Sequence, residues 1–152
     1  MNAFMPAEGD DAIVIPEKVA TEGEVIKMGT NAAFKPFEYA EGTEVVGFDI
    51  SMSEQIALDM GRQLQVEDMA FDSLLSALDT GVVDFVAAGL SPDEERKKQV
   101  DFSDPYYFGE QCCIIRKEDA EKYTSLESFK DQQIAAQTGS IQEGIAKEQF
   151  PG

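Results

Sequence analysis

The sequence contains no histidine and only two cysteines, Cys112 and Cys113, which are adjacent. A zinc site needs several nitrogen or sulfur ligands, so no metal site is expected, and no cofactor either. Neighbouring cysteines would form a strained disulfide. Their apolar surroundings favour small buried strand residues, and the alternative is a reactive vicinal pair. With no histidine to serve as general base, and no paired carboxylates that we place in a cleft, catalysis is not expected.

The chain is also poor in basic residues and in long apolar stretches. Lysine and arginine number 12 against 30 acidic residues, a net charge of −18, which argues against nucleic acid and anionic membranes as partners. No apolar run approaches the ~20 residues of a membrane-spanning helix. Residues 1–12 lack the charged start and apolar core of a secretion signal, so we expect either a cytoplasmic protein or a form whose export signal was removed.

What is present is the composition of a globular protein, with 43% apolar and 28% charged residues in a chain of 152. Residues 1–23 mix proline, glycine and acids and are predicted to be an N-terminal tail. Strands are predicted at residues 25–29, 64–68 and 82–88, and residues 31–47 as a long loop or hairpin. The near-continuous apolar character of 82–88 suits a parallel sheet covered on both faces, so we predict an α/β layer fold.

Helices are expected between and after these strands. A Ser51–Glu54 capping box opens the first, whose Ile56 and Met60 are predicted to share a core stripe with Leu64. Asp72 is predicted to cap a second helix that ends at Gly81. After another short helix that follows Ser91, strands are expected at 111–116 and 133–137, and Ser140 caps a final helix. These elements predict one α/β unit over residues 24–108 and the start of a second over residues 109–152.

The most informative stretch begins at Gly89, where an apolar strand ends in glycine and a helix is expected with Ser91 as its cap. A strand end that meets a helix start is a usual ligand position in open α/β sheets, and free backbone N–H groups there attract an anion. Arg96, in the second turn of this helix, is placed to fold back and grip a carboxylate through two parallel N–H bonds. The alternative is that Ser91 only caps and that Arg96 pairs with Glu94, Glu95 or another surface acid.

A second helix start, Thr138-Gly-Ser140, follows another apolar strand and offers hydroxyl groups, a flexible glycine and a free helix N-terminus. Phe34 and Phe71 lie in or near strand-to-helix loops, where flat apolar walls sandwich an aliphatic chain; the alternative for each is a core position. Gly89 lets backbone carbonyls approach an ammonium group, or it only relieves crowding. The two anion-binding turns would then face one another across the ligand.

Five motifs occur in the order seen in the polar-amino-acid-binding proteins of ABC transporters, over about residues 24–150. They are Gly29-Thr-Asn-Ala-Ala-Phe-Lys-Pro-Phe-Glu38, Gly47-Phe-Asp-Ile50, Phe71-Asp72, Ala88-Gly-Leu-Ser91 and Glu95-Arg-Lys-Lys-Gln-Val-Asp-Phe-Ser103. The chain therefore resembles extracytoplasmic solute-binding proteins of the glutamine-, histidine- and arginine-binding type. The resemblance implies a periplasmic-binding-protein-like two-lobe α/β fold. The first lobe (24–108) is expected to be nearly complete. The second, with its crossover strand (109–152), is expected to be partial and C-terminally truncated.

The resemblance also implies roles for individual residues. Arg96 and the Ser91 hydroxyl bind the α-carboxylate of the ligand, and Ser140 completes that clamp from the second lobe. Ala88 and Gly89 supply backbone contacts. The full set of ligand-binding residues implied is Asn31, Phe34, Phe71, Ala88, Gly89, Ser91, Arg96, Gln137, Thr138 and Ser140.

The remaining roles concern the side chain of the ligand. Phe34 stacks on the ligand, Phe71 forms the opposing wall, and Gln137 lies where glutamine-binding members contact the ligand's side chain. Asn31 stands where many members have an acid, and Ile141 where some have a hydroxyl or glycine. The resemblance therefore leaves the identity of the amino acid open.

The function implied is that of the solute-binding component of an amino-acid ABC transporter. Such a protein captures an amino acid between its lobes and delivers it to a membrane permease, from the periplasm or from a lipid anchor outside the cell. Two alternatives stay open. One is a cyclohexadienyl-dehydratase-like enzyme on the same fold, and the other is a homodimer in which the chain completes its sheets without binding a ligand.

Overall fold

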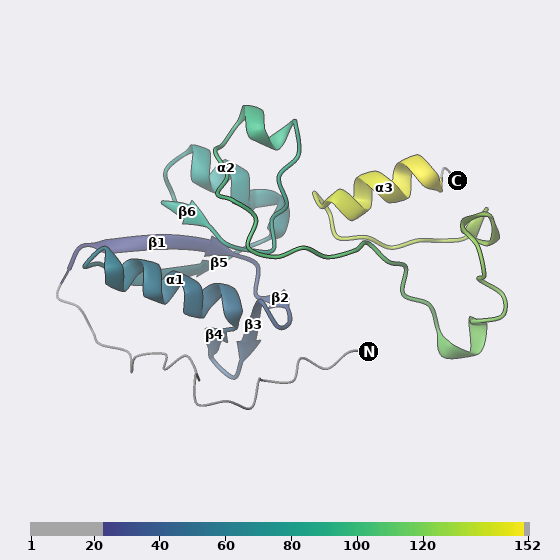
Figure 1. The fold of residues 1–152 in the computed structure, drawn as a ribbon, viewed down its shortest axis with the longest axis horizontal. Coiled ribbons are helices and arrows are strands. Elements are labelled where there is room, and N and C mark those ends of the chain that lie inside the picture. The colour runs from purple at the N-terminus through teal and green to yellow at the C-terminus, as the bar shows by residue number, and fades with distance from the viewer. Residues whose placement is uncertain (1–22, 151–152) are drawn as a thin grey trace.

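The computed structural model describes residues 23–150, and its body is a parallel three-stranded sheet (Figure 1). Strand β1 (Val25–Thr30) lies in the centre, with β5 (Gln63–Asp68) on one side and β6 (Phe85–Val86) on the other. All three strands run parallel. The strands predicted in this part of the sequence are confirmed, although β6 is shorter than predicted. The predicted tail, residues 1–23, lies outside the described residues except for Gly23.

Helices cover both faces of this sheet, because a chain that joins parallel strands must cross over one face. The two helices are α1 (Phe48–Asp59) and α2 (Leu74–Asp79). Successive side chains of β1 point to opposite faces. Met28 packs against Ile50 of α1, whereas a side chain at Gly29 would contact Leu74 of α2. The helices therefore lie on opposite faces, which confirms the predicted α/β layers.

The stretch of chain that joins β1 to α1 forms a second, antiparallel sheet. Its strands, in spatial order, are β2 (Ala33–Phe34), β3 (Glu38–Glu41) and β4 (Glu44–Val46). Gly42, with φ of +64°, makes the turn between β3 and β4. The hairpin predicted within residues 31–47 is confirmed, as part of a three-stranded sheet.

Two predicted helix caps are wrong. Helix α1 begins at Phe48, three residues before Ser51, because Gly47 turns the chain into the helix with φ of +132°. A Cβ at Gly47 would collide with the backbone of the hairpin, so this position requires glycine. Asp72 does not cap α2 either: it lies in the 3-10 turn Phe71–Ser73, and α2 starts without a side-chain cap bond.

The predicted core stripe of the first helix is also wrong. Ile56 and Met60 are exposed, and only Leu64, which belongs to β5, packs against the core. The buried residues of α1 are Asp49, Ile50, Ser53 and Ala57. Three of these four inward-facing residues are polar or small, and for this reason the apolar spacing was misleading.

The segment after Ser91 forms a single 3-10 turn, Arg96–Lys98, instead of the predicted helix. Asp93 precedes this turn, and its Oδ1 accepts hydrogen bonds from the backbone N–H groups of Glu95 (2.9 Å) and Arg96 (2.8 Å). An aspartate commonly bonds to backbone groups two and three residues further on and so stabilises a turn. Asp93 therefore stabilises the start of this turn, and the prediction that Ser91 caps a helix here is wrong.

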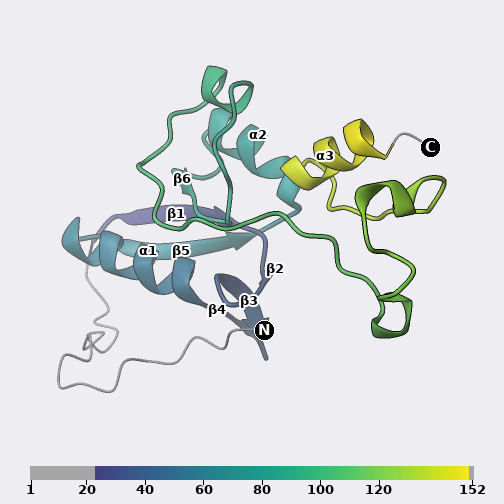
Figure 2. The same ribbon diagram turned by 45° about the vertical axis from the view of Figure 1, so that its right-hand side comes forward.

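Beyond about residue 100 the chain leaves the sheet and runs to helix α3 (Ile141–Gln149), as Figures 1 and 2 show. Two further 3-10 turns, Lys117–Asp119 and Leu126–Phe129, lie on the way. No helix within residues 23–150 combines the length and apolar character needed to cross a membrane.

The strands predicted at 111–116 and 133–137 do not form. Neither segment has a neighbouring strand to bond with in the described part of the chain, and strand formation depends on such a partner. Cys112 and Cys113 are consequently exposed, so the prediction that they are buried is wrong. Ile114, next to them, is 95% exposed.

Candidate functional site

The carboxyl ends of β1, β5 and β6 meet at one edge of the parallel sheet, and the loops after them form the candidate site. Asn31 follows β1, and its amide Nδ2 donates to the carbonyl of Met69, just after β5, at 2.7 Å. The carboxylate of Asp68 accepts from the backbone N–H of Ala32 at 2.9 Å. These bonds hold the first two loops together.

Ala88 and Gly89 follow β6 at the same edge. Ala88 is buried, and Gly89 has φ of +55°, in the left-handed region that favours glycine. A Cβ at Gly89 would lie 3.0 Å from the ring of Phe34, so the missing side chain lets this ring approach the backbone. Phe34 stacks on Phe37 with ring centroids 5.5 Å apart and is 53% exposed. Phe34 is therefore a wall of the loop region and not a core residue.

Arg96 is 8% exposed, and its guanidinium joins two turns that are far apart in the sequence. Its Nη1 donates to the carbonyl of Ser91 at 2.7 Å, and its Nη2 donates to the carbonyl of Gly139 at 2.9 Å. Nε lies 3.4 Å from Oδ2 of Asp93, and the guanidinium carbon lies 5.8 Å from the centroid of the Phe71 ring. Each terminal nitrogen of arginine carries two N–H groups, so one on each is left for another acceptor.

The alternative that Arg96 pairs with a surface acid is confirmed for Asp93 but not for Glu94 or Glu95. Those two carboxylates pair with Lys97 and Lys98, at 3.1 and 2.6 Å, on the outside of the turn. Arg96 points the other way, toward the ends of the strands, and its acidic partner is Asp93.

The second turn, Thr138-Gly-Ser140, lies directly against the loops that follow β1 and β5. Gly139 has φ of +76°, and a Cβ there would lie 2.8 Å from Cβ of Asp72. Gln137 donates from Nε2 to Oδ1 of Asn31 at 2.8 Å. With the bond from Arg96 to Gly139, the structure brings the two predicted turns together, and they face one another as expected.

Ser140 caps helix α3 as predicted. Its Oγ accepts from the backbone N–H of Glu143 at 3.2 Å and donates to the carbonyl of Gln137 at 2.6 Å. The serine is 8% exposed, whereas the neighbouring Thr138 is exposed. The Ser140 hydroxyl hydrogen is therefore already used within the turn, and the Thr138 side chain is the more accessible of the two.

A buried acidic cluster lies beside these loops, and the sequence interpretation gave it no role. Asp49, fully buried at the start of α1, accepts from the Tyr106 hydroxyl at 3.0 Å to each oxygen and from the backbone N–H of Gly89 at 3.2 Å. Glu38 of β3 is 1% exposed next to it, and its Oε2 has no hydrogen-bond partner in the described chain. Burial, with the charge of Asp49, raises the pKa of Glu38 to about 9 and raises that of Tyr106 as well.

The sequence carried one signal for this cluster. Glu38 ends the first of the five motifs and Asp49 lies within the second, but nothing in a sequence with 30 acidic residues marks these two as buried. Only the folding of the hairpin against α1 brings the two carboxyl groups together.

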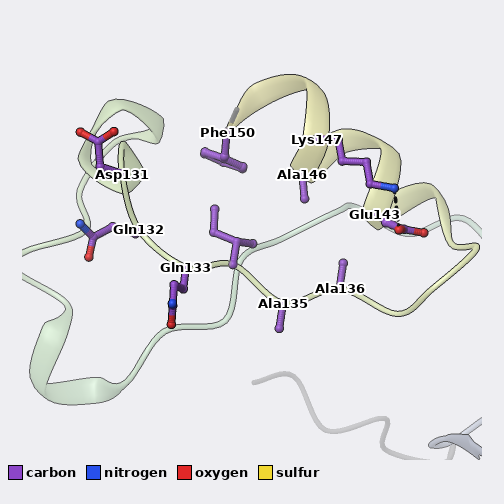
Figure 3. Close-up of a pocket in the computed structure, with 10 residues that line it drawn as sticks. Asp131, Gln132, Gln133, Ala135, Ala136, Glu143, Ala146, Lys147 and Phe150 are labelled. Atoms are coloured by element: carbon purple, nitrogen blue, oxygen red, sulfur yellow. Dashed lines mark hydrogen bonds and ion pairs between the residues drawn. The ribbon is translucent and has the colours of Figure 1, made fainter. Parts of the chain in front are cut away.

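A cavity of about 910 Å³ lies in the C-terminal part of the chain (Figure 3). Residues 131–136 form one side, and Ala146 and Phe150 of the α3 end point toward them from the other. Lys147 and Glu143, joined at 2.7 Å, lie at its rim. None of the predicted ligand-binding residues lines this cavity, so it is separate from the candidate site.

Comparison with known protein families supports the fold. The model of the family described as bacterial extracellular solute-binding proteins, family 3, matches residues 26–148. The chain is 44% identical over 124 residues to the arginine-binding extracellular protein ArtP of Bacillus subtilis, covering 82% of this chain and 48% of that protein. It is 31% identical over 133 residues to ABC transporter arginine-binding protein 1 of Escherichia coli, covering 87% and 54%.

Solved structures of amino-acid-binding proteins match the fold of this chain as well. The ancestral amino acid-binding protein AncCDT-1, a precursor of cyclohexadienyl dehydratase, matches with a TM-score of 0.80 and 36% identity over 84% of this chain and 57% of that one. The amino acid ABC transporter substrate-binding protein AbpA from Streptococcus pneumoniae, bound to L-arginine, matches with a TM-score of 0.80 and 34% identity, over 84% and 55%. The predicted periplasmic-binding-protein-like α/β fold is thus confirmed. The chain spans about half the length of the curated relatives it matches.

Proposed function

We propose that this chain, which belongs to the bacterial extracellular solute-binding proteins of family 3, captures an amino acid non-covalently and grips its α-carboxylate with Arg96. The placement of Arg96 is the observation that carries this proposal. The guanidinium is nearly buried and fixed by the carbonyls of Ser91 and Gly139, yet each terminal nitrogen has a further N–H. A carboxylate that accepts from both makes the bidentate, charge-assisted pair for which arginine is suited.

The other proposed contacts lie around Arg96. The Ser91 and Thr138 hydroxyls extend the carboxylate site from the two turns, and Ser140 holds the second turn in shape through its bond to Gln137. The carbonyls of Ala88 and Gly89 accept from the ligand's ammonium group. Phe34 and Phe71 supply apolar walls for its aliphatic stem.

We propose a basic amino acid as the ligand, with L-arginine the first to test. Relatives at 44% and 31% identity are named arginine-binding proteins, and a structural relative holds L-arginine. The amide groups of Asn31 and Gln137, bonded to each other at 2.8 Å, lie at the mouth of the loops and offer oxygen acceptors to a guanidinium. The net charge of −18 also favours a cationic ligand over an acidic one.

Delivery to a membrane permease of an ABC transporter and an extracytoplasmic location complete the proposal. Both are drawn from the family, whose members are extracellular, and from the transporter relatives. Co-purification of the chain with the permease encoded beside it would support the partnership, and failure to bind that permease with ligand present would contradict it.

Calorimetry with variants tests the assigned role of Arg96. We expect L-arginine to bind the wild-type chain, Arg96→Ala to lose about 100-fold in affinity and Arg96→Lys about 10-fold, because lysine keeps the charge without the planar fork. Lys97→Ala is the matched control: it removes the neighbouring positive charge, which pairs outward with Glu94. Equal affinity with and without the arginine side chain would refute the assigned role, and a wild-type chain that binds no common amino acid would refute the function.

One observation favours a second candidate, association with another copy of the chain. Segments 111–116 and 133–137 have no strand partner among the described residues, and Ile114 is 95% exposed. Exposed extended segments of this kind pair readily with another chain. Light scattering that finds only folded monomer at high concentration would exclude this candidate. Turnover of prephenate or arogenate would instead support the enzymatic alternative that the dehydratase precursor suggests.

A further inference from the structure

We infer that Asp49 is a positioning residue of the amino-acid site: its buried carboxylate orients the Ala88–Gly89 peptide, and with it the Ala88 carbonyl, toward the ligand's ammonium group. This inference rests on the function proposed above and deepens it. It concerns the amine end of the ligand, whereas Arg96 concerns the carboxylate.

The carboxylate of Asp49 bonds directly to the backbone of Gly89. Asp49 is 0% exposed, in the first turn of α1, and its Oδ2 accepts the backbone N–H of Gly89 at 3.2 Å. The same carboxylate accepts the Tyr106 hydroxyl at 3.0 Å to both oxygens, so it cannot turn away from Gly89 without losing that bond. Asp49 thereby connects α1, the loop after β6 and the segment that carries Tyr106.

The geometry of the peptide unit fixes the direction of the Ala88 carbonyl. The N–H of Gly89 and the C=O of Ala88 belong to one planar trans peptide, in which the two bonds point in opposite directions. Because Asp49 holds the N–H toward α1, the Ala88 carbonyl points away from α1. A carboxylate on the N–H side also polarises the peptide, which makes the carbonyl oxygen a stronger acceptor for a cation.

The carboxyl group of Glu38 adds no second negative charge next to Asp49. Glu38 from β3 and Tyr106 from the chain after residue 100 are the titratable groups that face Asp49. Glu38 has a pKa of about 9 because it is buried beside Asp49, so it keeps its proton at neutral pH. Asp49 therefore faces an uncharged carboxyl together with the donors of Gly89 and Tyr106.

A pair of ligands separates this role from general damage to the fold. L-Arginine and 5-guanidinopentanoic acid, which is arginine without its α-ammonium group, are titrated into wild type, Asp49→Asn and Asp59→Asn by calorimetry. Asp59 is the matched control, an exposed acid at the end of the same helix. We expect Asp49→Asn to weaken L-arginine about 10-fold and the analogue less than about twofold, because only the ammonium uses the Ala88 carbonyl.

Tyr106→Phe keeps the test decisive if Asp49→Asn does not fold. It removes one donor from Asp49 and leaves the bond to Gly89, so we expect about a threefold loss for L-arginine and none for the analogue. Equal losses for both ligands, or no loss for either, would overturn the inference. The proposed function fails separately, since its failure is a wild-type chain that binds neither ligand.

Discussion

Replacing Glu38 with glutamine should change how the stability of this protein depends on pH. Glutamine has nearly the same shape, and its amide donates to Asp49 as a protonated carboxyl does, but it has no proton to lose. Glu38 is 1% exposed, and its pKa is raised from 4.5 to about 9. In the wild type the folded chain therefore keeps a proton that the unfolded chain releases above pH 4.5.

The sign and the size of the effect follow from proton linkage. Between pH 4.5 and 9 the folded state binds more protons than the unfolded state, so the free energy of unfolding falls as the pH rises. Each unit of pH in this window lowers the free energy of unfolding by about 1.4 kcal/mol. The total loss between pH 4.5 and pH 7 is about 3 kcal/mol. Glu38→Gln should be more stable than the wild type at pH 7, by an amount that grows with pH.

Urea denaturation of both proteins at several pH values between 5.5 and 8.5 measures this difference directly. We expect the difference in unfolding free energy to grow by about 4 kcal/mol across that range. Glu41→Gln, which removes an exposed carboxyl at the end of the same strand, controls for the loss of charge. Two denaturation series that stay parallel over the whole range would refute a buried, neutral Glu38.

Two further substitutions test the packing that positions the site. Leu74→Ala should lower the free energy of unfolding by about 3 kcal/mol, measured by urea denaturation, because Leu74 is fully buried between α2 and the sheet. Gly139→Ala should cost about 1 kcal/mol or more and weaken ligand binding, since φ is +76° there and the new Cβ would meet Asp72 at 2.8 Å. Gly144→Ala, in the open middle of α3, should instead be neutral or stabilising, and a similar loss at both glycines would contradict the strain argument.

The parts of the fold that sequence patterns predicted are those that local chemistry decides. The β-branched run of β1 and the apolar run around β6 were recognisable, as was the glycine after α2, Gly81, with φ of +72°. The start of α1 was not, because Gly47 takes its unusual conformation from the hairpin packed against it. Nor was the inward face of α1, where Ser53 is fully buried although serine is usually exposed.

The candidate site also has parts that local sequence patterns predicted and parts that they did not. The turn before Arg96 was recognisable because it follows an apolar strand, although no helix starts after Ser91, and the turn at Ser140 was recognisable because serine commonly caps a helix, although no strand precedes Thr138. The acidic cluster was not, because two acids in a chain of net charge −18 are normally solvated. Their burial depends on contacts between residues 11 and 57 positions apart, and no local pattern reports such contacts.

In the proposed function Arg96 has two tasks that reinforce each other. Its bonds to Ser91 and Gly139 hold the two turns together, and each uses only one N–H of a terminal nitrogen. A carboxylate bound to the remaining N–H groups would add to these bonds without replacing them. Binding and contact between the turns would then stabilise one another, because an interaction that favours one arrangement of the chain raises the affinity of any ligand that needs it. In the proposed function the second turn is thus a part of the carboxylate site, although Arg96 itself lies in the segment after β6.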